Sequence, residues 1–389
     1  MNIIYRRAFM YKLLIIIISI FASGSIFAQT DIKYLNVSLW NPVATVPYSY
    51  DNSVMLSLGL LQSKTNNIYG LSASALSGVT AGNMYGFQFG GLHSRIEGAA
   101  KGVTISGLYN IHHASMSGVD MSGLATLNVV NHHGVQLSGV QNICMFNTDG
   151  VQMGGLMNVT GQMLSGVQLS GGFNVSNVVH GVQLSGIVNF ALQDCRGVQF
   201  SGFNYATSMR GMQIGVANFA RRINGVQLGI VNYSADSSTL KLGLVSISPK
   251  TKIRPMIYYS NLATLNVGFR FMNRISYTIL GLGTPYDAPQ TTSSGMFFYR
   301  VGLYKQVGRF IFSTDAGASY ISKFVESTET TALSAEGRVN VELAINKQLS
   351  VTCSGGCSLR KAFAGKRVKE AKPIVEFGIV LPNLLKSSR

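Results

Sequence analysis

The feature that most constrains this chain is a tandem repeat with a period close to 16 residues. Most units open on a glycine, then Val or Met, then Gln, as in the segment GVQLSGVQN that begins at Gly134. The units begin at Gly86, Gly102, Gly118, Gly134, Gly150, Gly166, Gly181, Gly197, Gly211 and Gly225, with a degenerate unit at Gly70. The spacing is 16 up to Gly166 and then 15, 16, 14 and 14. A period this regular indicates that structurally equivalent units stack on one another.

The length of the repeat selects one architecture. A membrane hairpin needs two strands of about 9–11 residues and their turns, which is more than this repeat holds. Two short strands and two corners fit, and such coils would stack about 4.8 Å apart. The sequence therefore predicts a β-solenoid over residues 70–233.

Alternation within each unit separates two sets of side chains. Val135 and Leu137 face one way, and Gln136 and Ser138 face the other. We expect the apolar set to form a continuous core, with Val135, Leu137 and Val140 lying over Val151, Met153 and Leu156. The glutamines would form one hydrogen-bonded ladder, made of Gln136, Gln152, Gln168, Gln183, Gln199, Gln213 and Gln227. The asparagines would form a second ladder, made of Asn142, Asn158, Asn174 and Asn189. We expect both ladders to be structural; a flat polar face that binds a polymer is the alternative.

A different pattern begins after Tyr233. Eight alternating segments cover 253–260, 263–271, 275–283, 296–305, 309–320, 335–345, 349–357 and 372–381. Over 338–345, for example, Val339, Val341 and Leu343 share one face, and Arg338 and Glu342 share the other. This pattern predicts an antiparallel β-domain and favours an eight-stranded outer-membrane barrel. A soluble sheet that caps the solenoid is the alternative, because a half-buried sheet has the same alternation.

The connections between these segments support the barrel. Residues 281–295, 321–334 and 358–371 are expected to form long outer loops, separated by short turns at 306–308 and 346–347. The very short Asn261-Leu262 connection does not fit this rule, nor does the tail after Leu381.

The N-terminus predicts export. Arg6, Arg7 and Lys12 precede the apolar stretch Leu13–Phe21, and a plausible cleavage site ends at Ala28. We therefore divide the chain into a signal peptide (1–28), an N-terminal β-segment or cap (29–69), the solenoid (70–233) and the antiparallel domain (234–389). Beyond residue 28 no stretch reaches the roughly 20 apolar residues of a membrane helix, so any membrane span must be a barrel.

The chain has a formal net charge of +16, although only 12% of its residues are charged. The basic residues lie mostly after residue 240 and are not clustered with aromatic residues in the repeats. We therefore expect no nucleic-acid partner, and an outer membrane or anionic envelope polymer is the favoured one. The small-molecule substrate, if any, and the oligomeric state are left open.

The candidate chemical groups are sparse. Between Gly102 and Tyr233 the only acids are Asp120, Asp149 and Asp194, each alone, which does not favour glycoside cleavage. No nucleophile elbow, P-loop or HExxH motif occurs. The sequence therefore predicts no catalytic site, no cofactor and no enzyme.

Histidine and cysteine give weak signals. His112-His113 and His132-His133 occupy different offsets in their units, so we expect no metal site. A disulfide between Cys353 and Cys357 is left open, although four residues of extended strand hold two cysteines too far apart to bridge.

The motifs also carry a resemblance. The block NVSLWNP that begins at Asn36, the segment Val54–Leu61 and the serial GVQLSG..N units resemble the surface-repeat family of bacterial envelope proteins, over about residues 34–247. The family is found in spirochaetes and Bacteroidetes, and it implies an exported, envelope-associated repeat protein without implying an activity. This chain departs from the lipoprotein members because no cysteine stands near the cleavage site.

Together these observations favour a non-enzymatic envelope protein with a structural, adhesion or surface-interaction role. The first alternative is a channel formed by the whole mature chain as one large barrel. The second is a glycan-binding or glycan-processing solenoid.

Overall fold

The computed structural model describes residues 32–49, 52–235, 240–249, 251–285, 294–325, 328–346, 349–362 and 369–384. The predicted signal peptide lies outside these residues. The chain divides into two compact units that meet between Asn177 and Val178, inside the repeats, and each unit is described by itself.

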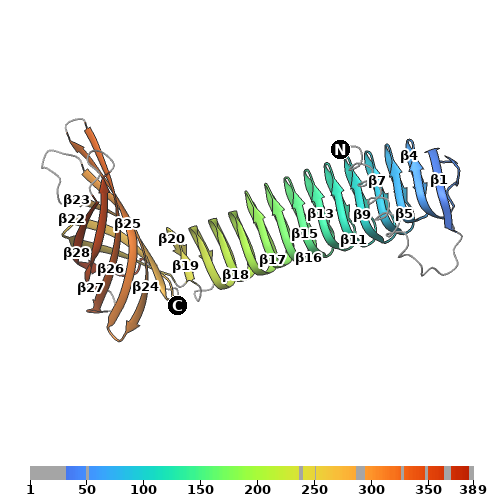
Figure 1. The fold of residues 1–389 in the computed structure, drawn as a ribbon. Helices are drawn as coiled ribbons and strands as arrows, with labels where there is room; N and C mark the ends of the chain where they lie inside the picture. The colour runs from blue at the N-terminus through green and yellow to red at the C-terminus, as the bar shows by residue number, and fades with distance from the viewer. Residues whose placement is uncertain are drawn as a thin grey trace, which may run out of the picture. The chain divides into compact units, whose positions relative to one another are not determined.

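The first unit is a stack of parallel β-coils (Figure 1). Its strands are β1 (Ile32–Trp40), β2 (Val43–Ala44), β3 (Ser53–Gly59), β4 (Gln62–Thr65), β5 (Asn67–Ser74), β6 (Ser77–Thr80), β7 (Met84–Gly90), β8 (His93–Ile96), β9 (Ala100–Ser106), β10 (Tyr109–His112), β11 (Met116–Ser122), β12 (Ala125–Asn128), β13 (His132–Ser138), β14 (Gln141–Cys144), β15 (Thr148–Gly154), β16 (Met157–Ser170) and the beginning of β17 (Phe173–Ser185). Each strand pairs in parallel with the equivalent strand of the next coil, so that Gly118, Gly134 and Gly150 are aligned. The pairing of β1 with β3, and of β3 with β5, is also parallel, so the coils start ahead of the first recognised repeat.

The repeated glycine is required by this stacking. Gly134 and Gly150 have φ angles of 127° and 131°, which L-residues rarely adopt. A Cβ atom added at Gly150 would lie 2.0 Å from the carbonyl oxygen of Gly134. The glycine of each coil therefore lets the backbones of neighbouring coils approach, which explains its strict recurrence.

The second unit contains further coils and a closed barrel (Figure 1). Its coil strands after β17 are β18 (Val188–Ser234), β19 (Leu240–Leu242) and β20 (Val245–Ile247). Gln227 pairs with Lys241 and Asn232 with Ser246, so one more coil follows the last recognised repeat.

The barrel has eight antiparallel strands, β21 (Lys252–Ser260), β22 (Ala263–Met272), β23 (Ser276–Pro285), β24 (Ser294–Val307), β25 (Phe310–Val325), β26 (Thr328–Ala344), β27 (Ser350–Ala362) and β28 (Lys369–Val380). It closes by pairing β21 with β28. These strands confirm the predicted all-β fold of a solenoid followed by an eight-stranded barrel. They also show that one large barrel formed by the whole chain is wrong, because the solenoid strands are parallel.

Two of the expected long loops are largely strand. Within 321–334, β25 continues to Val325 and β26 already begins at Thr328. Within 358–371, β27 continues to Ala362 and β28 begins at Lys369. Their Ser-, Thr- and Lys-rich sequences hid these strands, because alternation fades where both faces are polar.

No helix in the described part of the chain has the length and apolar character needed to cross a membrane.

Candidate functional site

The glutamine ladder lies inside the coils. The side chains of Gln136, Gln152 and Gln168 are fully buried. Gln152 Nε2 donates to Gln136 Oε1 at 2.7 Å, and Gln168 Nε2 donates to Gln152 Oε1 at 2.8 Å. In the second unit the same bonds, each 2.8 Å long, run from Gln199 to Gln183, from Gln213 to Gln199 and from Gln227 to Gln213. Each side-chain amide thus hydrogen-bonds to the amide of the neighbouring coil, which offsets the cost of removing it from water.

The asparagine ladder is also buried and runs in the opposite direction. Asn142 Nδ2 donates forward to Asn158 Oδ1 at 2.8 Å, whereas the glutamines donate to the preceding coil. In the second unit the ladder runs through Asn189, Asn204, Asn218 and Asn232, with bonds of 3.1, 2.9 and 2.9 Å. The last three were missed in the sequence because one residue is deleted before each of them, which shifts the asparagine within its unit.

The expected apolar core is wrong, because the apolar set faces outward. Val140, Met153 and Leu156 are 37%, 44% and 50% exposed, and Val135 and Leu137 are half-buried. Alternation shows which residues share a face, but it does not show which face is inside. Identical amides stacked in register bond to each other, so this interior accepts polar residues.

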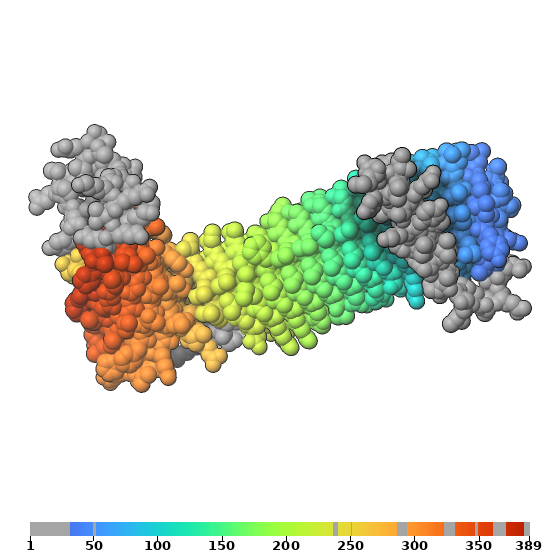
Figure 2. Space-filling model, in the orientation of Figure 1, coloured from blue at the N-terminus to red at the C-terminus, as the bar shows by residue number. Residues whose placement is uncertain are grey.

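The inward positions beside the ladders are mixed. The row that contains Ile68, Met84, Ala100 and Met116 is buried and apolar, and it continues as His132 and Thr148. The ladders therefore cannot form the polymer-binding face considered above. The outward side chains of successive coils instead line up in rows along the solenoid surface (Figure 2).

One coil of the first unit carries a charge in its interior, and the last coil of the second unit buries Lys241 at the position aligned with Gln227. Asp120 occupies the position aligned with Gln136 and is fully buried. Asn110 Nδ2 donates to its Oδ1 at 2.6 Å, Asn128 Nδ2 donates to its Oδ2 at 3.3 Å, and His112 Nε2 lies 3.3 Å from Oδ2. Burial by itself raises the pKa of Asp120, but His112, His132 and Asn110 outweigh it and lower this pKa below its usual value.

His132 lies in the same interior. Burial lowers the pKa of His132 to about 4, although the charge of Asp120 acts in the opposite direction. His132 is therefore neutral at pH 7, and neither of its ring nitrogens has a hydrogen-bond partner among the described residues. The structure thus places an acid and two histidines in one core where the sequence suggested isolated residues.

The other histidine and cysteine signals do not combine into a site. His113 and His133 are outward, 3.8 Å from Glu97 and 3.0 Å from Asp149. In the described part of the chain no group of three or more His, Cys, Asp or Glu could hold a metal ion.

The disulfide left open between Cys353 and Cys357 is not formed, because both residues are free and exposed on the same face of β27. Cys144 and Cys195 are free and buried in the coils, where burial raises the pKa of each thiol, that of Cys195 to about 12. The two cysteines of the coils therefore face the solenoid interior as protonated thiols.

The barrel interior holds a network of ion pairs. Arg254 and Arg270 contact Glu342 at 2.6 and 2.5 Å, and Arg300 contacts Glu376 at 2.9 Å. Arg338 lies among Asp315, Glu336 and Glu376. Each of these carboxylates contacts an arginine, and the eight side chains are at most 13% exposed.

The barrel exterior is apolar. Inward Ser334, Glu336, Arg338, Asn340 and Glu342 alternate along β26 with outward side chains, as the sequence predicted. The large exposed apolar residues of the wall include Leu265, Val267, Phe269, Leu282, Phe297, Leu333, Val339, Val341, Leu343, Val351, Leu359, Val375 and Phe377.

The last coil contacts the outer face of this wall. Ser276 and Thr278 are outward residues of β23, because they alternate with Tyr277, whose hydroxyl donates to Asp315 in the interior. Both are nonetheless fully buried. Their hydroxyls, and that of Tyr299, donate to backbone carbonyls of residues 241, 244 and 243 at 3.5, 3.4 and 2.9 Å. The polar residues on this part of the wall are thus explained by a protein contact.

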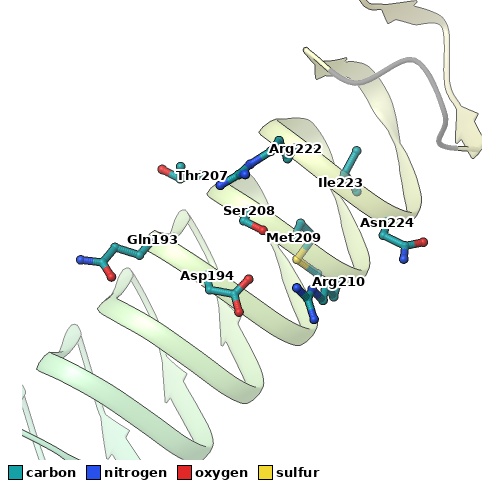
Figure 3. A pocket seen from close by; sticks show the side chains of 9 residues that line it. All are labelled: Gln193, Asp194, Thr207, Ser208, Met209, Arg210, Arg222, Ile223 and Asn224. Carbon is teal, nitrogen blue, oxygen red and sulfur yellow. The ribbon is translucent and has the colours of Figure 1, made fainter.

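A cavity of about 640 Å³ lies on the outside of three successive coils of the second unit (Figure 3). Its lining residues are Gln193, Asp194, Thr207, Ser208, Met209, Arg210, Arg222, Ile223 and Asn224. This cavity cannot be recognised in the sequence, because its residues come together only through stacking.

The chain has structural neighbours among small membrane barrels. It is similar to the crystal structure of Neisserial surface protein A, with a TM-score of 0.24 and 11% identity over 34% of this chain and 94% of that one. It is also similar to a de novo designed transmembrane β-barrel, with a TM-score of 0.22 and 14% identity over 34% of this chain and 92% of that one. No family model and no curated protein matches the sequence.

Proposed function

We propose that this protein is a non-enzymatic outer-membrane protein, in which the barrel spans the membrane and anchors a solenoid that serves as an interaction surface. The observation that carries the proposal is the inversion of the barrel, with paired charges inside and apolar side chains outside. Such a wall suits hydrocarbon, and a closed barrel leaves no unpaired strand edge in it.

The filled interior favours an anchor over a channel. Four arginines and four carboxylates from different strands meet inside the barrel, together with the buried Tyr258 and Tyr277. Eight-stranded barrels are just wide enough for side chains to fill. The pairing of each carboxylate with arginine also favours a structural role over acid–base catalysis.

The solenoid supports an interaction role through its exterior. Val, Leu, Met and Phe side chains are exposed in rows on its surface. Contiguous exposed apolar surface of this kind is typical of sites that bind apolar partners. The repeat resemblance to the surface-repeat family of envelope proteins agrees with this proposal.

The membrane location can be tested by one pair of substitutions. Val339, 65% exposed, lies in the middle of the outward run between Leu333 and Leu343 on β26 and would face hydrocarbon, whereas Val307, 55% exposed, ends β24 at a short turn. Val339→Arg should destabilise the barrel in lipid by about 2–4 kcal/mol, and Val307→Arg by at most about 1 kcal/mol. Heat-modifiable gel migration of isolated outer membranes measures the folded fraction of each variant. Equal tolerance of both substitutions, or recovery of the protein in the periplasmic extract, would refute the proposal.

A further inference from the structure

The coils of the second unit carry an uneven charge. Between Val178 and Ser234 the chain has four arginines, Arg196, Arg210, Arg221 and Arg222, and a single acid, Asp194. The coils from Met84 to Asn177 contain two bases and three acids. The positive charge of the solenoid is therefore concentrated in the coils that precede the barrel in the chain.

Stacking brings these arginines to one corner, which consists of the four residues before the repeated glycine in three coils (193–196, 207–210 and 221–224). Gly197, Gly211 and Gly225 lie over one another, because a Cβ at Gly211 would meet Gly197 O at 2.1 Å and a Cβ at Gly225 would meet Gly211 O at 1.8 Å. Arg196 and Arg210 directly precede two of these glycines, so they occupy the same outward position in neighbouring coils. Like charges in adjacent strand positions repel each other, which favours an anion between them.

Most of this corner lacks an internal counter-charge. Asp194 Oδ2 accepts a hydrogen bond from Arg196 Nε at 2.9 Å. Within the described part of the chain Arg210, Arg221 and Arg222 form no ion pair, and all three are exposed. Arg210 and Arg222 line the cavity with Ser208, whose hydroxyl adds a donor at the same corner (Figure 3).

An aromatic row passes next to Arg221. Phe203 stacks on Phe219 with ring centroids 5.2 Å apart, and Phe219 lies 5.9 Å from Tyr233. Phe190 continues the row at 6.1 Å from Phe203. Only Ala220 separates Phe219 from Arg221 in the chain. Aromatic rings beside arginine are typical of the boundary between lipid headgroups and acyl chains.

We propose that the outward corner and aromatic row of residues 187–233 dock on a membrane surface, with the arginines binding the phosphates of anionic lipids. Charge complementarity and continuity with the barrel carry the inference, because the final coil packs on the wall that faces lipid. This proposal rests on the membrane-spanning barrel proposed above.

The experiment places a tryptophan in each surface of the full-length protein. Trp40, the single native tryptophan, is first replaced by Phe. Phe219→Trp then reports on the solenoid, and Phe377→Trp reports on the barrel wall. The protein is reconstituted in vesicles that contain acyl-brominated lipids, which quench tryptophan on contact. We expect quenching at both positions in phosphatidylglycerol vesicles and, in zwitterionic phosphatidylcholine vesicles, at position 377 alone.

The arginines are tested by the triple variant Arg210→Gln, Arg221→Gln, Arg222→Gln. It should lower the ratio of docked to undocked solenoid by about a hundredfold, because each arginine near an anionic surface contributes about fivefold. Arg95→Gln with Lys101→Gln, in the first unit, is the matched control and should leave quenching unchanged. In the two tryptophan reporters with every arginine retained, raising the salt concentration should weaken quenching at 219 and leave 377 unaffected, which tests the charges without replacing an arginine.

The outcomes separate the two proposals. Absence of quenching at 377 would refute the membrane-spanning barrel. Quenching at 377 without quenching at 219, or quenching at 219 that ignores lipid charge and the triple variant, would overturn phosphate docking alone. Loss of quenching at 219 in millimolar inorganic phosphate, but not in chloride of equal ionic strength, would show a site for free phosphate and would also overturn the lipid assignment.

Discussion

The solenoid and the barrel both bury rows of polar side chains and expose apolar ones, but the polar groups that they bury differ. The solenoid buries neutral amides, and the barrel buries charges of opposite sign. The cause is the strand arrangement. Parallel coils in register place many polar residues on copies of themselves, as with Gln136 and Gln152, so a row of buried polar side chains must be able to hydrogen-bond to itself. Across the barrel unlike residues meet, as with Arg300 and Glu376.

In the first unit, the coil that contains Asp120 departs from this pattern. A row of aspartates would repel itself, and the neighbouring coils have Thr104 and Gln136 at this position. The single buried carboxylate is held by side chains that differ from those of the other coils, His112 among them. A repeat can thus bury one charge only where its neighbours depart from the repeat.

The largest expected difference between the regions comes from glycine. Gly150→Ala should prevent correct stacking, because the new Cβ would lie 2.0 Å from a backbone oxygen at a φ of 131°. We expect a loss of more than about 4 kcal/mol. Gly337→Ala in the barrel, where no described atom lies within 4 Å of the added Cβ, should change stability by less than about 0.5 kcal/mol. Denaturant midpoints of the two variants measure this; similar losses would contradict the stacked coil.

The barrel should be most sensitive to loss of one charge. Arg338→Met would leave Asp315, Glu336 and Glu376 with less compensation in a buried site. We expect the free energy of unfolding to fall by about 3–5 kcal/mol, because removing one partner of a buried ion pair leaves an uncompensated charge in the interior. Heat-modifiable migration in lipid would report it. Restoration by a second substitution, Glu336→Gln, would support the ion-pair account, and an unchanged barrel would contradict it.

The solenoid should show a smaller, pH-dependent effect at His132. Its pKa falls from 6.5 in the unfolded chain to about 4 in the folded one, so the unfolded chain binds the proton first as the pH falls. Stability should therefore be lost between pH 6.5 and 4, by up to about 3 kcal/mol. The lowered pKa of Asp120 makes a separate contribution, present above its unfolded pKa and lost only as the pH falls further through its folded one.

His132→Met, which copies the aligned Met116, should abolish the loss between pH 6.5 and 4. The control is His133→Ser, an exposed neighbour whose aligned residue is Ser117. Unfolding midpoints measured across this range for both variants check the assignment. The assignment to His132 fails if the two variants keep the same pH dependence as the unsubstituted protein.

The sequence predicted much of the fold because stacking and alternation are visible in it. The repeat established the coils, and the faces of segments such as 338–345 matched the barrel strand. The sequence led to the wrong interior for the solenoid. Alternation with a period of two shows that Val135 and Leu137 share a face, but it does not show whether that face is inside or outside. The recurrence of Gln at one offset was the available signal, since self-pairing rows are tolerated in a core.

The arginine corner could not be found from local sequence. Arg196, Arg210 and Arg222 are separated by 14 and 12 residues, and the count of basic residues alone drew attention to the region after 240. Only the exact length of the shortened coils brings them together. The contact of Ser276 with the last coil was equally hidden, because it joins two segments of different pattern.

The central claim, that the solenoid buries its glutamine ladder and exposes the apolar set, is tested most directly by thiol accessibility. In the folded protein a membrane-permeant maleimide should modify Met153→Cys rapidly, because Met153 is 44% exposed. The native Cys144 and the variant Gln152→Cys, whose positions are fully buried, should be modified only after unfolding. Peptide mass spectrometry assigns each site. Rapid modification of Cys144 together with protection of Met153→Cys would contradict the account.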